Sequence, residues 1–370
     1  MDDIEDYQPR ETEVVATDRG RLEIFFDEPL PDRGNVVALD SPDGETVYAV
    51  VRRHLGGNRV RAAMPEVPDW LQVGTSATAP GGRAGLTIEG GRLELDPGAL
   101  VPETDDGDWF PIDWRKPDFA DITAATAPVD TGYDGIDTVA PPVAGGLNLL
   151  IDQSNDASAF QRLAERVVDG VSSAEAIYVA DASGKTTPDW ADTVVEPGAG
   201  AFGRIFAIRT AVALTSHRRD AGRETLIVGH LPAVGRTVAD DEEVGASPGY
   251  GELVDRIGAG LVSTDDARVT SLFRLPVPRR HSDIGPIIET LDVGDVDAQL
   301  LIDTDGRFDP ERSSSDAPLD DDRRARQTDA RDTLRRAERA RDKAQLLGKQ
   351  ELLPDEEAAI ERADTLRDQV

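Results

Sequence analysis

Short apolar runs separated by turn residues fill the first quarter of the chain. The runs lie at residues 21–26, 35–39, 46–54 and 59–64, and Gly56-Gly57-Asn58 separates the last two. Closely spaced short strands punctuated by Gly, Pro, Asn and Asp are typical of a β-sandwich or a β-barrel. The pattern predicts a β-barrel domain over residues 13–95, preceded by a disordered acidic N-terminus over residues 1–12.

The middle of the chain follows a different pattern, in which apolar strands alternate with amphipathic helices. The predicted strands lie at residues 147–151, 176–180, 224–229, 268–277 and 298–303, and the helices include residues 157–171 and 201–222. This alternation predicts a mostly parallel sheet with helical crossovers. We assign the α/β domain to residues 131–310. The segment before it, residues 96–130, is rich in Pro, Asp and Trp and is predicted to be a linker.

Two charged helices are predicted near the C-terminus. A polar linker over residues 311–323 leads to a helical region over residues 324–370. Ala330, Leu334, Ala337 and Arg341 share one narrow face of the first helix, and Pro354 stands at the start of the second. Their many charges favour a solvated helical surface over a specific acidic binding site. The expected fold class is therefore multi-domain: an N-terminal β-barrel, a central α/β domain and a short C-terminal helical segment.

The charge balance of the chain is extreme. Its 72 acidic and 40 basic residues give a formal net charge of -32. Dense carboxylates are expected in a protein from a high-salt cytoplasm, where they hydrate the surface while salt screens their repulsion. High net charge with few aromatic residues also occurs in disordered chains, but the regular apolar periodicity favours a folded protein. Because the whole chain is acidic, the charge argues only mildly against nucleic acid as a partner.

The composition excludes several kinds of site. The chain has no cysteine, which rules out disulfides, thiolate metal sites and a cysteine nucleophile. No window approaches ~18 consecutive apolar residues, so we predict no membrane-spanning helix. The acidic start of the sequence lacks the basic and apolar regions of a signal peptide. The expected location is the cytoplasm.

Gly184-Lys185-Thr186 follows a predicted strand and has the ending of a phosphate-binding loop. The full pattern needs a glycine five positions before Gly184, where this chain has Val179. A phosphate loop also needs free backbone N–H groups in front of a helix N-terminus. Here Asp181 places a carboxylate where phosphate would lie, and no helix is predicted after Lys185. These residues therefore do not predict a working phosphate loop.

Other combinations of catalytic residues have little support in the sequence. The histidines are His54, His217, His230 and His281, and no two have the H-x-x-x-H spacing of a metal site. Residues 245–249 match the hydrolase pattern G-x-S-x-G with Ser247 as nucleophile, but Pro248 lacks the N–H that the oxyanion hole needs, which favours a loop. His230 ends a predicted strand, where α/β sites form and where it could act as a base. A structural histidine is the favoured interpretation.

Four segments, in the same order, resemble one known family. They are residues 48–64, residues 131–146 with the pattern T-G-x-x-x-x-D-x-x-x-P-x-x-x-G-G, residues 219–230 beginning R-D-x-G, and residues 347–363. Together they resemble the catalytic β subunit of the rotary ATPase / ATP synthase family, in a degenerate haloarchaeal-type form. The resemblance implies an N-terminal β-barrel, a RecA-like (P-loop NTPase-like) central domain and a C-terminal helical domain. The segments that carry the resemblance cover only part of that helical domain.

The resemblance places the phosphate loop at residues 152–159, where the chain has no glycine. Ser158 falls on the lysine position and Ala159 on the magnesium-binding hydroxyl position. Asp152 and Asp156 put carboxylates where the triphosphate would lie. Two unit charges ~4 Å apart repel by about 1 kcal/mol in bulk water and about 4 kcal/mol near a protein surface. The loop is therefore expected to disfavour a nucleotide.

The other positions implied by the resemblance are also changed. Gly184 falls on the family's catalytic glutamate, Lys185 on the following arginine, and His230 on the magnesium-supporting aspartate. Arg312 is a candidate for the family's trailing arginine. Phosphoryl transfer needs a positive clamp, a metal held by oxygen ligands and a group that orients water. We therefore predict no catalytic residue and no metal ligand, and we expect no cofactor; Mg-ATP would bind only if this interpretation is wrong.

Three functional hypotheses follow from the sequence. The first is a non-catalytic assembly or regulatory protein that forms a homo-oligomer or a hetero-oligomer, with ATPase-type subunits as candidate partners. The second is a nucleotide-binding subunit or ATPase of a proton-translocating complex. The third is an RNA-binding RecA-like ring protein. The predicted barrel lacks the aromatic cluster on which bases stack, since Phe25 and Phe26 are its only adjacent aromatic pair. Nucleic acid is therefore a disfavoured partner.

Overall fold

The computed structural model describes residues 12–18, 20–27, 29–105, 108–113, 117–124, 127–154, 156–181, 187–198, 200–231, 257–277 and 296–367. The chain divides into two compact units. The first consists of Met1–Arg115, Tyr178–Pro188 and Asp192–His217, and the second of Lys116–Ile177, Asp189–Ala191 and Arg218–Val370. Each unit is described by itself.

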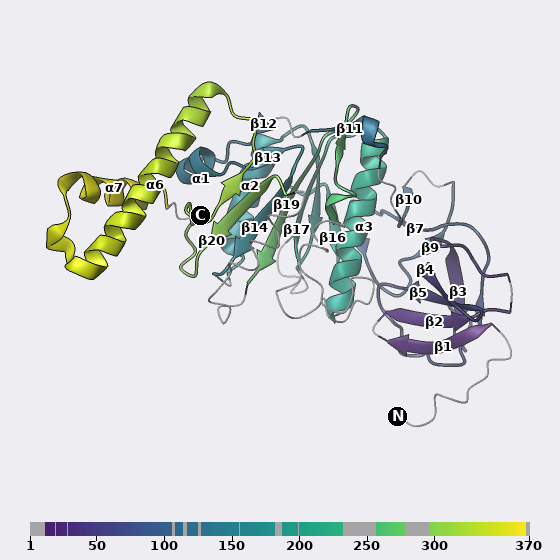
Figure 1. Cartoon of the computed structure of the whole chain (residues 1–370). Helices are drawn as coiled ribbons and strands as arrows, with labels where there is room; N and C mark the ends of the chain where they lie inside the picture. The colour runs from purple at the N-terminus through teal and green to yellow at the C-terminus, as the bar shows by residue number, and fades with distance from the viewer. Residues whose placement is uncertain are drawn as a thin grey trace. The chain divides into compact units, whose positions relative to one another are not determined.

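The first unit contains a curled antiparallel sheet of six strands in the order β1-β2-β5-β4-β3-β6 (Figure 1). The strands are β1 (Glu13–Asp18), β2 (Arg21–Phe25), β3 (Val36–Asp40), β4 (Thr46–Gly56), β5 (Arg59–Ala63) and β6 (Ala77–Thr78). The N–H of Val14 donates to Thr75 O (2.9 Å) and that of Ala77 to Thr12 O (3.0 Å), which joins the two ends of the sheet. The four strands predicted for this region are confirmed, and Asn58 adopts φ 60° in the predicted turn.

Short strands follow the curled sheet along the chain. β7 (Ala84–Thr87) lies between β9 (Val101–Pro102) and β10 (Trp109–Pro111) in a small sheet. Gly85 of β7 has no room for a side chain, because a Cβ there would overlap the Trp109 ring and the Phe110 carbonyl. Further along, η1 (Phe119–Asp121) precedes β11 (Ile122–Thr123), which pairs with β18 (Ser263–Thr264), and β12 (Ala127–Pro128) pairs with β13 (Val143–Ala144). The segment predicted as a linker thus carries several short paired strands.

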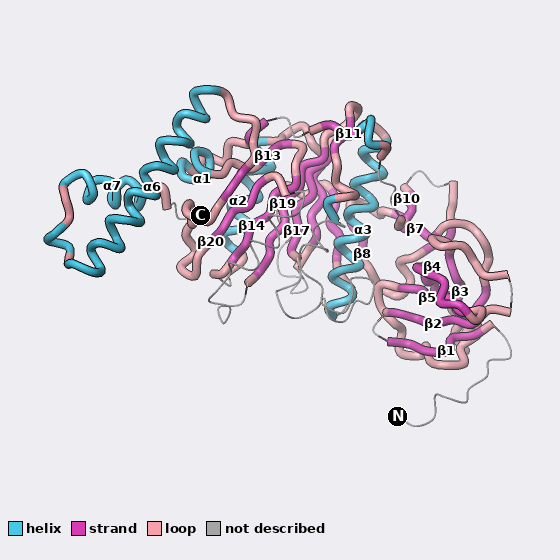
Figure 2. Tube along the Cα trace, in the orientation of Figure 1, coloured by secondary structure: helices cyan, strands magenta, loops and turns pink. Residues whose placement is uncertain are grey.

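The main sheet has eight strands in the order β21-β20-β14-β19-β17-β15-β16-β8 (Figure 2). They are β8 (Arg92–Glu94), β14 (Leu147–Asp152), β15 (Glu175–Val179), β16 (Thr193–Glu196), β17 (Thr225–His230), β19 (Val269–Pro276), β20 (Ala298–Ile302) and β21 (Ser314–Ser315). β14 pairs in parallel with β19 and β20, and β17 pairs in parallel with β19. All five apolar strands predicted for the α/β region are present. All six residues of β14 are buried, as expected for a strand covered on both faces.

The predicted helices of this region are confirmed as α2 (Ser158–Gly170) and α3 (Gly200–Asp220), and a short helix, α1 (Asp134–Val139), precedes β13. α2 buries Ala159, Phe160, Leu163, Ala164 and Val167. Their spacing of three or four residues places one apolar stripe against the protein interior. In the last turn of α3, Arg219 is only 1% exposed, and its Nη1 donates to the carbonyls of Gly260 and Val262.

The C-terminal region is a pair of contacting helices, α6 (Asp321–Leu347) and α7 (Pro354–Thr365), joined through η3 (Lys349–Glu351). The Asp320 carboxylate accepts the N–H of Arg323 (2.7 Å) and caps α6. Gly348, with φ 97°, ends it, because a positive φ suits glycine. The buried face of α6 contains Ala330, Leu334 and Ala337, as predicted. Small residues on this face and at Ala359 and Ala363 of α7 let the two helices pack closely.

Candidate functional site

The predicted loop positions, residues 152–159, lie at the junction between β14 and α2. Asp152 is the last residue of β14, and α2 begins at Ser158. The strand that follows β14 along the chain is β15, which lies beyond β19 and β17 in the sheet. The strand β20, which comes after β19 along the chain, lies in the other direction, beyond β14. The carboxyl ends of β14 and β19 therefore form a topological switch point, which is where open α/β sheets bind their ligands.

A buried ion pair fills this position. Asp152 is fully buried, and its Oδ2 lies 2.6 Å from Arg274 Nε, on the neighbouring strand β19. The Arg274 side chain is itself only 8% exposed. The second oxygen of Asp152 accepts the backbone N–H of Ser154 (2.8 Å) and the Ser154 hydroxyl (2.6 Å). A buried charge is tolerated when it is paired and hydrogen-bonded, and Asp152 meets both conditions.

The loop after Asp152 is held by its own side chains. Asp156 accepts the Ser158 N–H (2.9 Å) and the Ser158 hydroxyl (2.7 Å), and the Asp156 N–H donates to Ser154 Oγ (3.1 Å). These bonds from Ser158 lower the pKa of the Asp156 carboxyl, with smaller contributions from Arg162 and Arg274. In a phosphate loop, backbone N–H groups at this place point at the ligand. Here the N–H groups of Ser154 and Ser158 donate to carboxylates instead.

The two positions expected to hold lysine and the magnesium-binding hydroxyl carry neither group. Ser158 begins α2, and its hydroxyl is bonded to Asp156. Ala159 is 3% exposed and belongs to the apolar face of the helix. A serine hydroxyl brings no positive charge to a phosphate, and a buried methyl group cannot bind a metal ion.

His230 ends β17, one strand away from β14 across β19. It is 7% exposed and stands directly across from Arg274 in the strand register. Its ring lies edge-on to Phe160 of α2, with centroids 4.6 Å apart and an interplanar angle of 64°. Such edge-to-face packing is favourable between aromatic rings. His230 thus packs beneath the start of α2, close to the Asp152–Arg274 pair.

The remaining candidates are dispersed or lie outside the described residues. Gly184, Lys185, Thr186, Ser247 and His281 all fall outside them. His54 Nε2 is 2.8 Å from Pro31 O, and the His217 ring centroid is 6.3 Å from that of Phe110. Arg312 is 54% exposed and pairs loosely with Asp309 (3.9 Å). In these contacts, the described candidates His54, His217 and Arg312 have partners other than Asp152 and Arg274.

The described ranges lack a metal-binding cluster and a membrane-spanning helix. Among those residues, no group of three or more His, Cys, Asp or Glu side chains is arranged to hold a metal ion. In the same part of the chain, no helix combines the length and the apolar character needed to cross a membrane.

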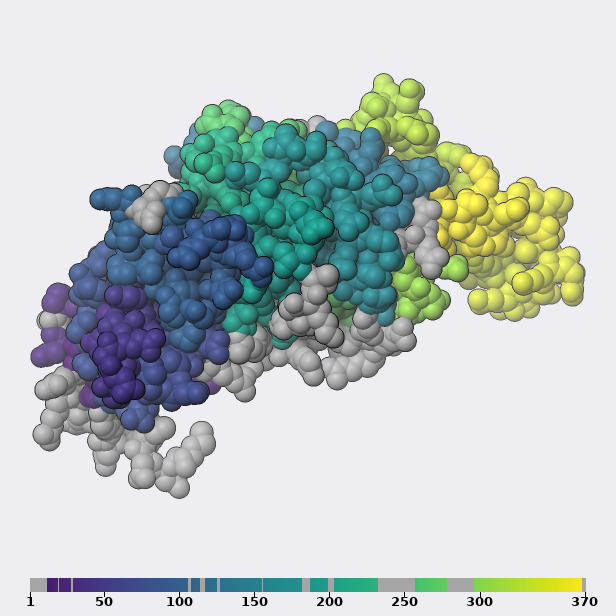
Figure 3. All heavy atoms as spheres, turned by 180° about the vertical axis from the view of Figure 1, so that it is seen from behind, coloured from purple at the N-terminus to yellow at the C-terminus, as the bar shows by residue number. Residues whose placement is uncertain are grey.

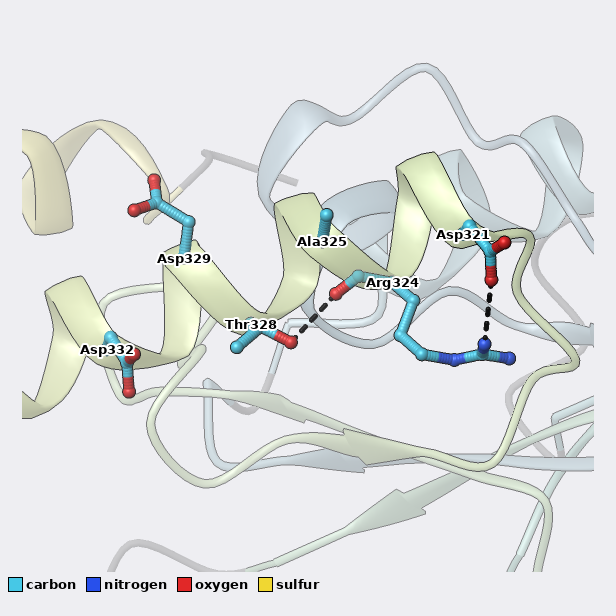
Figure 4. Close-up of a pocket in the computed structure, with 6 residues that line it drawn as sticks. All are labelled: Asp321, Arg324, Ala325, Thr328, Asp329 and Asp332. Atoms are coloured by element: carbon cyan, nitrogen blue, oxygen red, sulfur yellow. Dashed lines mark hydrogen bonds and ion pairs between the residues drawn. The ribbon is translucent and has the colours of Figure 1, made fainter.

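A shallow pocket on α6 is lined by Asp321, Arg324, Ala325, Thr328, Asp329 and Asp332 (Figure 4). Arg324 Nη1 pairs with Asp321 (3.2 Å), and the Thr328 hydroxyl donates to the Arg324 carbonyl (2.8 Å). Asp329 and Asp332 point in different directions along the helix. The carboxylates do not converge on one point, which agrees with a solvated helical surface.

Arg274 is the residue that the sequence did not single out. It lies 122 positions from Asp152 along the chain, and no local pattern links the two. One signal was available: Arg274 is the sole charged residue of the apolar β19. A charged side chain inside a strand buried on both faces needs a partner of opposite charge.

No protein-family model matches the sequence.

Proposed function

We propose that this protein is a non-catalytic relative of the rotary ATPase β subunits, with a RecA-like central domain, and that it acts in assembly or regulation. One observation carries the proposal: a buried Asp152–Arg274 pair lies at the loop that the resemblance assigns to a nucleotide's phosphates. In the main sheet, β14 lies between two parallel neighbours and is followed by a loop and a helix, which supports the RecA-like assignment.

Three features of the loop disfavour nucleotide binding. The loop has no glycine and no lysine to wrap and neutralise phosphate. Its N–H donors at Ser154 and Ser158 are already bonded to carboxylates. The Asp156 carboxylate would also repel a phosphate oxygen ~4 Å away by about 4 kcal/mol at the effective dielectric of a protein surface. Binding would require breaking these bonds, and the loop has no lysine to compensate for their loss.

A protein that retains this architecture without a phosphate site would act through its surfaces. Its partners would be other copies of the chain or ATPase-type subunits, with which it would assemble or which it would regulate. No cofactor is needed for such a role. The same architecture with a working site would instead be a nucleotide-binding subunit, so nucleotide affinity separates the two hypotheses.

Isothermal titration of the full chain with Mg-ATP and Mg-ADP in molar KCl tests the proposal. We expect no saturable binding up to millimolar nucleotide, which corresponds to a binding free energy weaker than about -4 kcal/mol. The Asp156→Asn variant is the matched control, because it removes one repelling charge and leaves the Asp152–Arg274 pair intact. It should not bind either. Saturable binding by the unmodified chain below millimolar concentration would refute the proposal and favour the nucleotide-binding alternative.

A filter-retention assay with single-stranded RNA tests the third hypothesis under the same conditions. Because electrostatic binding to nucleic acid weakens steeply with salt, it should be repeated at the lowest salt at which the protein stays folded. We expect no retention. Retention at both salt concentrations would replace the assembly role with an RNA-binding role.

A further inference from the structure

Three exposed leucines lie together along the chain where α6 turns back toward α7. Leu346 is 83% exposed, Leu347 62% and Leu353 55%. They flank the Gly348 turn and η3, at the end where the two helices are joined (Figure 1). We call these three residues the leucine tip. They are three of the five large apolar side chains that are strongly exposed in the described part of the chain.

The helices that carry the leucine tip differ in charge from the rest of the protein. Between residues 321 and 367, twelve arginines and lysines balance twelve aspartates and glutamates. The formal charge of -32 therefore resides entirely in the other residues. Two of the four lysines of the chain, Lys343 and Lys349, lie beside the leucine tip. Figure 3 shows this region in yellow in the space-filling view.

We expect two copies of the chain to associate at a lower free-energy cost through these neutral helices than through the acidic parts of the protein. Contact between the acidic parts of two copies would press carboxylates together, and molar salt screens only charges that stay more than about 3 Å apart. It would also strip water from those carboxylates. Contact between two leucine tips buries apolar side chains and brings no net charge together.

The tip is also self-complementary. In a two-fold symmetric contact the same patch faces itself, so residue i of one copy meets residue j of the other and the reverse. Lys349 and Glu351 are both exposed, have opposite charges, and lie between the leucines. Each can therefore meet the opposite charge on the second copy. Lys343 and Glu356 already pair within one chain (2.8 Å) and hold the first turn of α7 against α6.

We propose that the leucine tip is a self-association surface through which two copies of this chain form a two-fold symmetric dimer. The proposal goes beyond the function proposed above and stands whether or not a nucleotide binds. Stable interfaces bury about 800 Å² on each partner, and three leucines supply only part of this. We therefore expect a weak dimer with micromolar affinity.

Sedimentation equilibrium of the full chain from about 1 to 200 µM, a range that brackets micromolar affinity, tests this in molar KCl. We expect a monomer–dimer equilibrium. Combining Leu346→Ser, Leu347→Ser and Leu353→Ser should raise the dissociation constant at least tenfold, equivalent to about 1.4 kcal/mol. These side chains are exposed, so the variant should keep the circular dichroism spectrum of the parent. Val73→Ser and Phe119→Ser remove exposed apolar side chains elsewhere, 48% and 92% exposed, and should leave the equilibrium unchanged.

A cross-linking experiment checks the symmetry of the contact. The chain has no cysteine, so Gln350→Cys places a single thiol next to the tip, and oxidation should give a covalent dimer. Asp43→Cys, in an exposed turn of the first unit, should not cross-link. A chain that stays monomeric at the highest concentration, forms a larger ring, or dimerises equally well without the three leucines would overturn the proposal.

Discussion

Replacing Arg274 with methionine tests whether the Asp152–Arg274 pair supports the fold. Methionine keeps most of the volume of the arginine side chain but leaves the fully buried Asp152 carboxylate without its cation. Removing one partner of a buried ion pair costs about 3–5 kcal/mol. Because Ser154 still donates two hydrogen bonds to Asp152, we expect the lower end of this range, about 3 kcal/mol.

The assay is urea unfolding in molar KCl, followed by circular dichroism, with Arg268→Met as the control. Arg268 precedes the same strand and pairs with Glu224 (2.7 Å), but its side chain is 44% exposed. An exposed ion pair contributes ~0–1 kcal/mol, so the control should lose little stability. Comparing the two variants separates the effect of breaking a buried ion pair from the effect of losing an arginine.

A double-mutant cycle completes this prediction. Asp152→Asn removes the charge and keeps an acceptor for Ser154, so Asp152→Asn combined with Arg274→Met leaves no buried charge. We expect a coupling free energy of about 2 kcal/mol or more, near the upper end of values for residues in contact. A cost below about 1 kcal/mol for Arg274→Met alone, or additive single effects, would refute the reasoning.

Two further predictions concern other parts of the molecule. Burial and the neighbouring Glu311 raise the pKa of Asp309 to about 6, so between pH 4 and 6 the folded state keeps a proton that the unfolded state has lost. The free energy of unfolding should therefore fall as the pH rises from about 4 to 6, by about 2–3 kcal/mol. Glu311, whose own pKa is lowered, opposes part of this change. Asp309→Asn should flatten that slope and stabilise the protein at pH 7, as followed by urea unfolding across this pH range; an unchanged slope would contradict the assignment. Gly85→Ala should cost about 1–3 kcal/mol because its Cβ would overlap Trp109 and Phe110. Gly98→Ala, whose nearest neighbouring atom is 3.5 Å away, should change the unfolding free energy by less than about 0.5 kcal/mol, and equal effects of the two substitutions would argue against this close packing.

The sequence predicted the longer elements well because their signals are local. The apolar runs at residues 147–151 and 298–303 became β14 and β20 with ends shifted by one residue, since an uninterrupted apolar run shows which residues are buried. β9, β11 and β12 have two residues each, too few to establish a period. The order of strands in the main sheet is set by long-range pairing and left no trace in any local pattern.

The strand end that carries Asp152 was predictable from the sequence, but the side chain that pairs with it was not. Asp152 was expected to face the phosphates of a nucleotide as a repelling charge, and the structure places it at the expected strand end. Its partner Arg274 comes from a strand far along the chain. Whether a carboxylate repels a ligand or completes an internal pair depends on which side chain lies opposite it, and only the folded structure provides that information.

The edge strands of the main sheet affect whether strands from other molecules can add to it at high protein concentration. The outermost strands are β8, with three residues, and β21, with two. A long open edge presents a row of unpaired backbone groups onto which a foreign strand can add, whereas strands this short offer very few. Arg92 and Glu94, at the two ends of β8, add exposed charges to that edge. Growth of amyloid-like ribbons from these two edges is therefore disfavoured.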